Sequence, residues 1–325
     1  MLERLAGGLE QSSSIELVHI ETWPIGTNDA DPDTNITLAP DFDGDGLYRA
    51  YSFGRLGRAS NVQSQWFNES TYSRFGTRHT LMHDRSTPTL FPLKIAYVTS
   101  ENELMATAGN SVSRVQDTNF FLDELTPFAP SFVRFRGIRH LIWWTETDQL
   151  MIGEMPESDQ LINRRLIKAA DDNGGITLRG EFQPTAIEHN GRLYVLSQYG
   201  QLNTRTDTLS LSVSDDGVSW QHQSIELSIS TPPRPVITVL DGRLFIFFHG
   251  HRLDAYVRYI SSADGESWSP ERDLPIPESF DSEGHVGVQG GIGVAPYRDG
   301  LAVSWISLEG NLAWPTRTAY YEIAN

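Results

Sequence analysis

One pattern occurs three times in the middle of the chain: PSFVRFRGIRHLIWW (130–144), PTAIEHNGRLYVLSQ (184–198) and PVITVLDGRLFIFFH (235–249). In each stretch a glycine follows a proline by seven residues and separates two runs of β-branched, aromatic and aliphatic residues. Such runs are typical of β-strands, and a glycine between them supplies the positive φ of a tight turn. Each stretch therefore predicts a β-hairpin.

The hairpin pattern recurs in more degenerate form along the rest of the chain. APDFDGDG precedes LYRAYSF (39–53), PTLFPLKIAYV covers 88–98, and GVAPYRDG precedes LAVSWIS (293–307). The turn glycines, with Ile95 as the equivalent in the second copy, mark six units of about 50 residues, and they are Gly46, Ile95, Gly137, Gly191, Gly242 and Gly300. The fourth and fifth units continue into a third strand, a turn and a fourth strand, at 210–227 and 259–274. Four antiparallel strands in a unit of this length predict an all-β fold, a six-bladed β-propeller of four-stranded blades.

The last unit contains only three strand-like runs. The N-terminal run SIELVHIETW (14–23) has strand composition and precedes the first unit. We expect this run to complete the last blade, because closure of the ring protects the open sheet edges. The expected organisation is a single propeller domain, 1–325, with residues 1–13 as a flexible N-terminal segment.

Charge and composition exclude several classes of function. The chain has 325 residues, with 25 Lys and Arg against 42 Asp and Glu, a formal net charge of −17. Such an acidic surface repels phosphate backbones, so no nucleic-acid partner is expected. The absence of cysteine excludes disulfides, thiolate metal sites and cysteine nucleophiles. No apolar run reaches the roughly 18 residues of a membrane span, and no signal peptide is visible, so we expect a soluble protein without membrane insertion. The compartment, cytoplasmic or secreted in a mature form, and the oligomeric state stay open.

Two copies of a second motif, SDDGVSW (214–220) and SADGESW (262–268), stand 48 residues apart. Their side chains suit a structural turn, in which Ser and Asp bond to turn amides, Gly takes the left-handed position and Trp covers the core. The residues of the two turns are Ser214, Asp216, Gly217 and Trp220, and Ser262, Asp264, Gly265 and Trp268. The motif resembles the Asp box of the sialidase-like (BNR-repeat) β-propeller superfamily.

That resemblance implies that the boxes lie on turns away from the ligand face and report the fold, not the activity. Sialidases of this kind carry an early Phe/Tyr-Arg-Ile-Pro motif, whereas here Ala50 and Tyr51 follow Tyr48 and Arg49. We therefore do not expect true sialidase activity.

Loops that join blades, and loops that join the second strand of a blade to the third, open on one face of a propeller. Their planar polar groups, carboxylates and aromatic rings suit a sugar or another hydroxylated ligand. The alternative interpretation is that these residues are polar only because the mouth of a propeller is exposed to water. The predicted ligand-binding residues are Arg85, Trp144, Gln198, Tyr199, Arg234, His285 and Gln289. The candidate catalytic residues are Glu146, Glu181, His249 and His251.

Two patterns resemble metal sites only weakly, and we predict neither a metal nor any other cofactor. His249 and His251 form a His-x-His pair, for which His285 or Asp254 would have to supply a third ligand. Asp41, Asp43 and Asp45 stand at alternate positions as in a calcium loop, but the twelfth residue is Ser52 and not the bidentate Glu. The turn of the first hairpin already accounts for these aspartates, and whether they bind calcium stays open.

The expected function is binding of a glycan or another polar small molecule in one axial pocket, because the face loops differ from blade to blade. A single unlike site also suits an enzyme. The alternatives are a glycoside hydrolase that pairs Glu146 with Glu181 or Asp148, and a lyase-like or cyclase-like enzyme that uses His249 or His251 for proton transfer. A protein-interaction scaffold is the third hypothesis.

Overall fold

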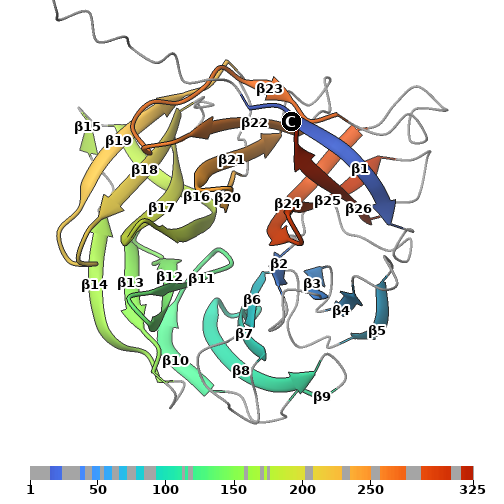
Figure 1. Cartoon of the computed structure of the whole chain (residues 1–325). Helices are drawn as coiled ribbons and strands as arrows, with labels where there is room; N and C mark the ends of the chain where they lie inside the picture. Colours follow the sequence, from blue (N-terminus) through green and yellow to red (C-terminus); the bar gives the residue numbers. More distant parts are fainter. Residues whose placement is uncertain are drawn as a thin grey trace, which may run out of the picture.

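The computed structural model describes 26 strands and many of the tight turns between them. The described residues are 15–23, 37–40, 46–51, 55–60, 66–71, 78–83, 93–111, 114–115, 120–156, 160–168, 172–173, 176–201, 208–228, 235–249, 257–275, 287–308 and 316–324. Within them, strands form six antiparallel sheets set around a common centre (Figure 1). No helix occurs in this part of the chain, so none in it is long and apolar enough to cross a bilayer.

The first three blades follow one another in sequence order, and each starts with its innermost strand. Blade 1 consists of β2 (Thr37–Pro40), β3 (Gly46–Tyr51), β4 (Arg55–Ser60) and β5 (Trp66–Thr71). Blade 2 consists of β6 (His79–His83), β7 (Leu93–Val98), β8 (Glu103–Ser111) and β10 (Phe120–Leu125), with the short β9 (Arg114–Val115) also paired to β8. Blade 3 consists of β11 (Ser131–Phe135), β12 (Ile138–Trp144), β13 (Leu150–Glu154) and β14 (Ile162–Lys168).

The last three blades repeat this order, and the sixth takes its outermost strand from the N-terminal end. Blade 4 consists of β16 (Ile176–His189), β17 (Arg192–Gln201), β18 (Thr208–Ser214) and β19 (Gln221–Glu226), with the short β15 (Asp172–Asn173) paired to β16. Blade 5 consists of β20 (Val236–Leu240), β21 (Arg243–His249), β22 (Val257–Ser262) and β23 (Arg272–Asp273). Blade 6 consists of β24 (Gly287–Tyr297), β25 (Gly300–Leu308), β26 (Thr316–Ile323) and β1 (Leu17–Trp23).

The inner strands close a ring. Contacts run from β2 to β6, β11, β16, β20 and β24, and β24 returns to β2. The strand β1 pairs antiparallel with β26, from Leu17 opposite Ile323 to Trp23 opposite Thr318. The predicted six-bladed propeller, closed by the N-terminal strand on the last blade, is therefore confirmed. The short extra strands β9 and β15 are additions that the four-stranded repeat did not predict.

The predicted hairpin turns form at Gly137, Gly191 and Gly242, whose φ angles are 78°, 75° and 69°. The preceding residues Arg136, Asn190 and Asp241 also have positive φ, between 47° and 51°. Two consecutive positive φ angles define the type I′ turn, which matches the twist of the strands that it joins.

Three of the six marked positions differ from the prediction. Gly300 is the first residue of β25, and the positive φ of that hairpin belongs to Arg298. Glycine is required at position 300 for another reason, since a Cβ there would overlap the carbonyl oxygen of Tyr321. Gly46 begins β3 and Ile95 lies inside β7, so these two mark strands and not turns.

The hydrophobic core lies between the blades. Trp143 belongs to an apolar cluster that blade 3 shares with blade 2, whereas Trp144 belongs to the cluster that it shares with blade 4. Successive side chains of a strand point to opposite faces of its sheet, so the run IRHLIWW buries both faces at once. The middle strands therefore read as nearly continuous apolar runs.

Candidate ligand-binding site

The axis of the ring holds a cavity of about 380 Å³. All six inner strands contribute to its wall, and the tight turns that follow β11, β16 and β20 define one face of the molecule. The lining residues are Leu38, Ala39, Thr80, Leu81, Met82, Ser131, Phe132, Arg134, Gln183, Thr185, Ala186, Ile187, Val236, Ile237, Thr238, Ile292, Gly293, Val294, Ala295 and Pro296. Most of these side chains are apolar.

Polar side chains of the wall help to hold neighbouring blades together. The Gln183 amide donates to the carbonyl oxygen of Pro130 at 2.6 Å. The Thr185 hydroxyl lies 3.5 Å from the carbonyl oxygen of Pro235 and accepts from the Ile237 backbone nitrogen at 3.2 Å. The repeated prolines thus mark where the inner strand of blade 4 is bonded to blades 3 and 5.

The two longest inner strands each contain a bulge at the same relative place. In β16 the pairing with β17 shifts between Glu181 and Thr185, and in β24 the pairing with β25 shifts between Gln289 and Gly293. Bulges redirect side chains and are frequent beside functional sites. The predicted site residues Glu181 and Gln289 therefore occupy equivalent register positions, although their side chains lie outside the described part of the chain.

Other predicted residues meet Glu181 across the sheet. Gln198 is its register partner on β17, and Tyr199 faces Gly180. The Gln198 side chain is buried, with 1% of its surface exposed, whereas the Tyr199 side chain lies outside the described residues. The structure thus brings Glu181 and Gln198 together on neighbouring strands.

Trp144 takes a different place from the one predicted. Its ring is fully buried in the cluster between blades 3 and 4, and its indole nitrogen donates to the Phe182 carbonyl oxygen at 3.1 Å. Phe182 stands inside the β16 bulge and has a φ of 61°. Trp144 consequently presents no open face to a ligand and instead holds the bulge next to Glu181.

Glu146 lies exposed on the turn between β12 and β13, which has a counterpart between β7 and β8. In both turns the threonine hydroxyl accepts from the backbone nitrogen four residues on, from Glu103 to Thr99 and from Gln149 to Thr145, each at 3.1 Å. The fourth turn residue has positive φ in each case. The sequences TSENE and TETDQ therefore fold into matching turns on neighbouring blades.

Arg78 connects these turns and was not singled out from the sequence. Its guanidinium donates to Asn102 Oδ1 at 2.8 Å, to the Thr99 carbonyl oxygen at 2.6 Å and to the Pro127 carbonyl oxygen at 2.9 Å. Asn102 Nδ2 then donates to Glu146 Oε1 at 3.1 Å. Burial lowers the pKa of Arg78. The sequence signal that could have identified Arg78 is its position directly before an inner strand. Arg234, which was selected as a candidate, has a similar position shortly before β20.

His249 is the last residue of β21, pairs with Val257 and is partly buried. The other predicted residues of this face, Arg85, Arg234, His251 and His285, lie outside the described residues, and so do Asp254 and the aspartates at 41, 43 and 45. In the described part of the chain, no three His, Asp or Glu side chains come together as metal ligands.

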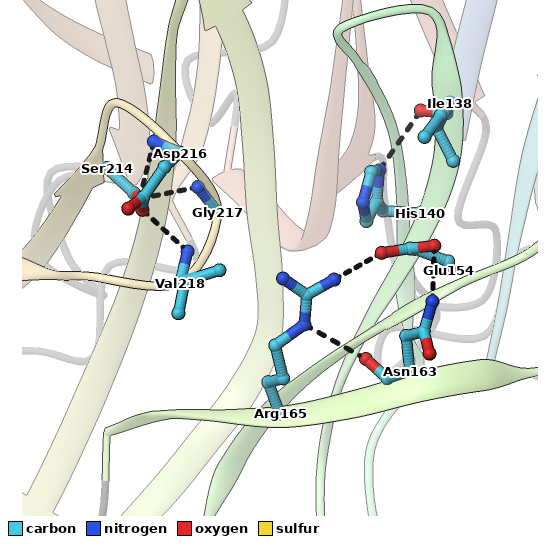
Figure 2. Close-up of polar contacts among 9 residues, drawn as sticks. All are labelled: Ile138, His140, Glu154, Asn163, Arg165, Ser214, Asp216, Gly217 and Val218. Carbon is cyan, nitrogen blue, oxygen red and sulfur yellow. Dashed lines mark hydrogen bonds and ion pairs between the residues drawn. The ribbon is translucent and has the colours of Figure 1, made fainter.

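The SDDGVSW turn holds its backbone with two side chains (Figure 2). The Ser214 hydroxyl accepts from the Gly217 nitrogen at 2.8 Å, and Asp216 Oδ1 accepts from the Ser219 and Val218 nitrogens at 2.7 and 2.8 Å. The bonds from Ser219 and Val218 lower the pKa of Asp216 to about 2. The side chain of Trp220 packs on the cluster between blades 3 and 4.

The SADGESW turn repeats these contacts one blade later. The Ser262 hydroxyl accepts from the Gly265 nitrogen at 2.8 Å, and Asp264 Oδ1 accepts from the Glu266 and Ser267 nitrogens at 2.8 Å. The bond from Ser267 is the main cause that lowers the pKa of Asp264. Trp268 packs on the cluster between blades 4 and 5, as Trp220 does one blade earlier.

A second polar network crosses blade 3 (Figure 2). Glu154 forms an ion pair with Arg165 and accepts from Asn163 Nδ2 at 2.8 Å. Beside it, His140 Nδ1 lies 3.0 Å from the Ile138 carbonyl oxygen, and burial lowers the pKa of His140. This network joins neighbouring strands of one blade and lines no part of the axial cavity.

Comparison with known proteins shows the fold. No family model and no curated protein matches this chain. Among solved structures, it is similar to the fungal lectin of Aleuria aurantia, a six-bladed β-propeller with a described fucose recognition mode (TM-score 0.62, 9% identity, 92% of this chain and 97% of that chain). It is also similar to AofleA from Arthrobotrys oligospora (TM-score 0.60, 11% identity, 98% and 92%). A third match is a subtype N11 neuraminidase-like protein of A/flat-faced bat/Peru (TM-score 0.57, 9% identity, 95% and 94%).

Proposed function

We propose that this chain is a sialidase-like propeller that binds one glycan or similar polar small molecule at its axial cavity. The observation that carries the proposal is that equivalent positions in different blades contribute chemically different side chains to the wall of that cavity. Ser131, Thr185 and Val236 each follow the repeated proline, line the cavity and differ in side-chain chemistry. A site built from unlike residues on a common axis accepts one ligand per chain.

Two further observations support the glycan and the sialidase-like parts of the proposal. The Aleuria aurantia lectin, which shares the fold, recognises fucose, and a neuraminidase-like protein shares it as well. The paired Ser-x-Asp-Gly-x-x-Trp turns have the same hydrogen bonds in blades 4 and 5, as a repeated structural box requires.

Isothermal titration calorimetry with methyl fucoside, and with ligands chosen from a glycan array, tests the proposal. We expect one site per chain. Replacement of Thr185 by Val keeps the side-chain shape and removes the hydroxyl at the wall, and it should weaken binding. Ser219→Ala, at the distant SDDGVSW turn, is the control. Several equivalent sites per chain, or unchanged affinity in the Thr185 variant, would contradict an axial site.

Glycoside hydrolysis is the second candidate, and the β16 bulge favours it. Glu181 is the last paired residue before the bulge and stands opposite the buried Gln198. We assign the acid–base role to the carboxyl group at this register position, with Glu146 as its proposed partner. Glu181→Gln should abolish release of nitrophenol from aryl glycosides while ligand binding persists. If the wild-type protein releases none from any aryl glycoside, hydrolysis is excluded for that substrate class.

A further inference from the structure

Five of the six inner strands each contribute an apolar side chain to the wall of the axial cavity. We call this ring of side chains the apolar waist, and its members are Leu81, Phe132, Ala186, Ile237 and Val294. They come from β6, β11, β16, β20 and β24, so five blades contribute. None of these side chains can form a hydrogen bond. A sugar ring in the waist would lose the hydrogen bonds of its hydroxyls to water without replacement, which costs free energy.

Four polar residues of the cavity lie on the N-terminal side of the waist, whereas Arg134 and Thr238 lie on its C-terminal side, toward the turns. Ser131 precedes Phe132, Thr80 precedes Leu81, and Gln183 and Thr185 precede Ala186. Because the inner strands run in the same direction around the ring, these four residues lie on the side opposite the type I′ turns. The cavity therefore has polar groups at the predicted ligand face and apolar side chains at the waist, with Arg134 and Thr238 beyond the waist on the side of the turns.

We infer that the cavity binds glycosides with an apolar aglycone, with the sugar at the polar end and the hydrocarbon in the waist. The inference rests on the proposed function for the sugar and adds the class of aglycone. The cavity volume of about 380 Å³ equals roughly a dozen water molecules at about 30 Å³ each. That space suits a short alkyl or aryl group.

The test uses two series of alkyl glycosides, β-D-glucosides and α-L-fucosides, from methyl to octyl, with the matching alkanols as sugar-free probes. Calorimetry should show affinity that rises about fourfold per added methylene, the fold-change that corresponds to burial of one CH₂ at about 0.8 kcal/mol. The rise should stop when the waist is full. The glycosides should bind more tightly than the alkanols of equal chain length.

Two variants fill the cavity, and one variant adds the same ring outside it. Ala186→Phe and Val294→Phe place an aromatic ring in the waist and should remove the dependence on chain length. Ile138→Phe, on an exposed position of the β11–β12 hairpin, should preserve it. Thermal melts identify a filling variant that does not fold. In that case the chain-length dependence is tested with the other filling variant alone.

The outcomes separate this inference from the proposed function. Glycosides that bind with no dependence on chain length would overturn the aglycone inference and leave the glycan site standing. Alkanols that bind as tightly as the glycosides would support binding of a hydrocarbon in the waist and would contradict binding of the sugar at the polar end. An unchanged dependence in both filling variants, or no binding of any probe, would overturn the inference.

Discussion

The hydroxyl of Tyr259 accepts a hydrogen bond from the backbone nitrogen of Leu17 at 3.1 Å, across 242 residues of sequence. The same hydroxyl lies 3.3 Å from the Ile15 carbonyl oxygen, to which it donates. Tyr259 is a buried residue of β22 in blade 5, whereas Leu17 begins the strand that closes blade 6. One phenol thus fixes the closing strand to the neighbouring blade.

Replacement of Tyr259 by Phe should lower the free energy of unfolding by about 1–3 kcal/mol, because it leaves buried backbone groups of the closing strand without their partner. The ring and its packing against Phe245 and Phe247 are kept. Urea denaturation measures the change. Tyr320→Phe is the matched control, since its hydroxyl bonds only to Glu322 two residues away among the contacts described. Equal losses in both variants would contradict a special role in closure.

Glycines at positive φ are required for two different reasons, and a pair of variants separates them. A Cβ added at Gly242 (φ 69°) would have no atom within 4 Å, whereas one added at Gly265 (φ 77°) would have the Tyr194 ring at 2.6 Å. Gly242→Ala should cost only the left-handed conformation, about 1–2 kcal/mol. Gly265→Ala adds a steric overlap and should cost clearly more in the same urea titration. A smaller loss for Gly265→Ala would show that Tyr194 moves aside freely.

The aspartates of the SDDGVSW and SADGESW turns predict that the protein loses stability at acidic pH. The folded pKa of Asp216 is about 2, below its ordinary value of 3.8, and that of Asp264 is also lowered. A group with a depressed folded pKa contributes stability above its unfolded pKa and loses it as the pH falls through the folded value. The free energy of unfolding should therefore fall between about pH 4 and pH 2. The variant Asp216→Asn/Asp264→Asn should show a shallower fall in urea titrations at these pH values.

Local turn chemistry explains why much of the fold was predictable. Asn190-Gly191 and Asp241-Gly242 are dipeptides that favour a type I′ turn, and each forms one. The prediction that Gly300 supplies a turn was wrong, because glycine also occurs where two backbones approach closely. The carbonyl oxygen that requires a glycine at this position belongs to Tyr321, on a different strand. That contact depends on pairing within the blade and leaves no local pattern.

The site was less predictable than the fold for the same reason. Trp144 was expected at the ligand face because it ends a strand, but alternation along β12 turns its ring into the core between blades. The bulges beside Glu181 and Gln289 arise from the pairing between strands, which residue types alone do not reveal. The apolar lining of the axis likewise follows from which side of each inner strand faces the centre.

Arg78 gives the last prediction, because it joins the two matching turns of blades 2 and 3. Arg78→Ala leaves the Thr99 and Pro127 carbonyl oxygens and the Asn102 amide without their charged donor. The loss should be about 2–4 kcal/mol of unfolding free energy, since hydrogen bonds to charged groups contribute about 1.5–3 kcal/mol each and part is recovered from water. Arg78→Lys should recover only a fraction, because one ammonium cannot reproduce the planar fork. Arg192→Ala, which removes an exposed ion pair with Asp215 and a cation–π contact with Tyr194, is the control and should cost only about 1 kcal/mol. If Arg78→Lys is as stable as the wild type, the positive charge alone stabilises the turns, and the three hydrogen bonds of the guanidinium are not required.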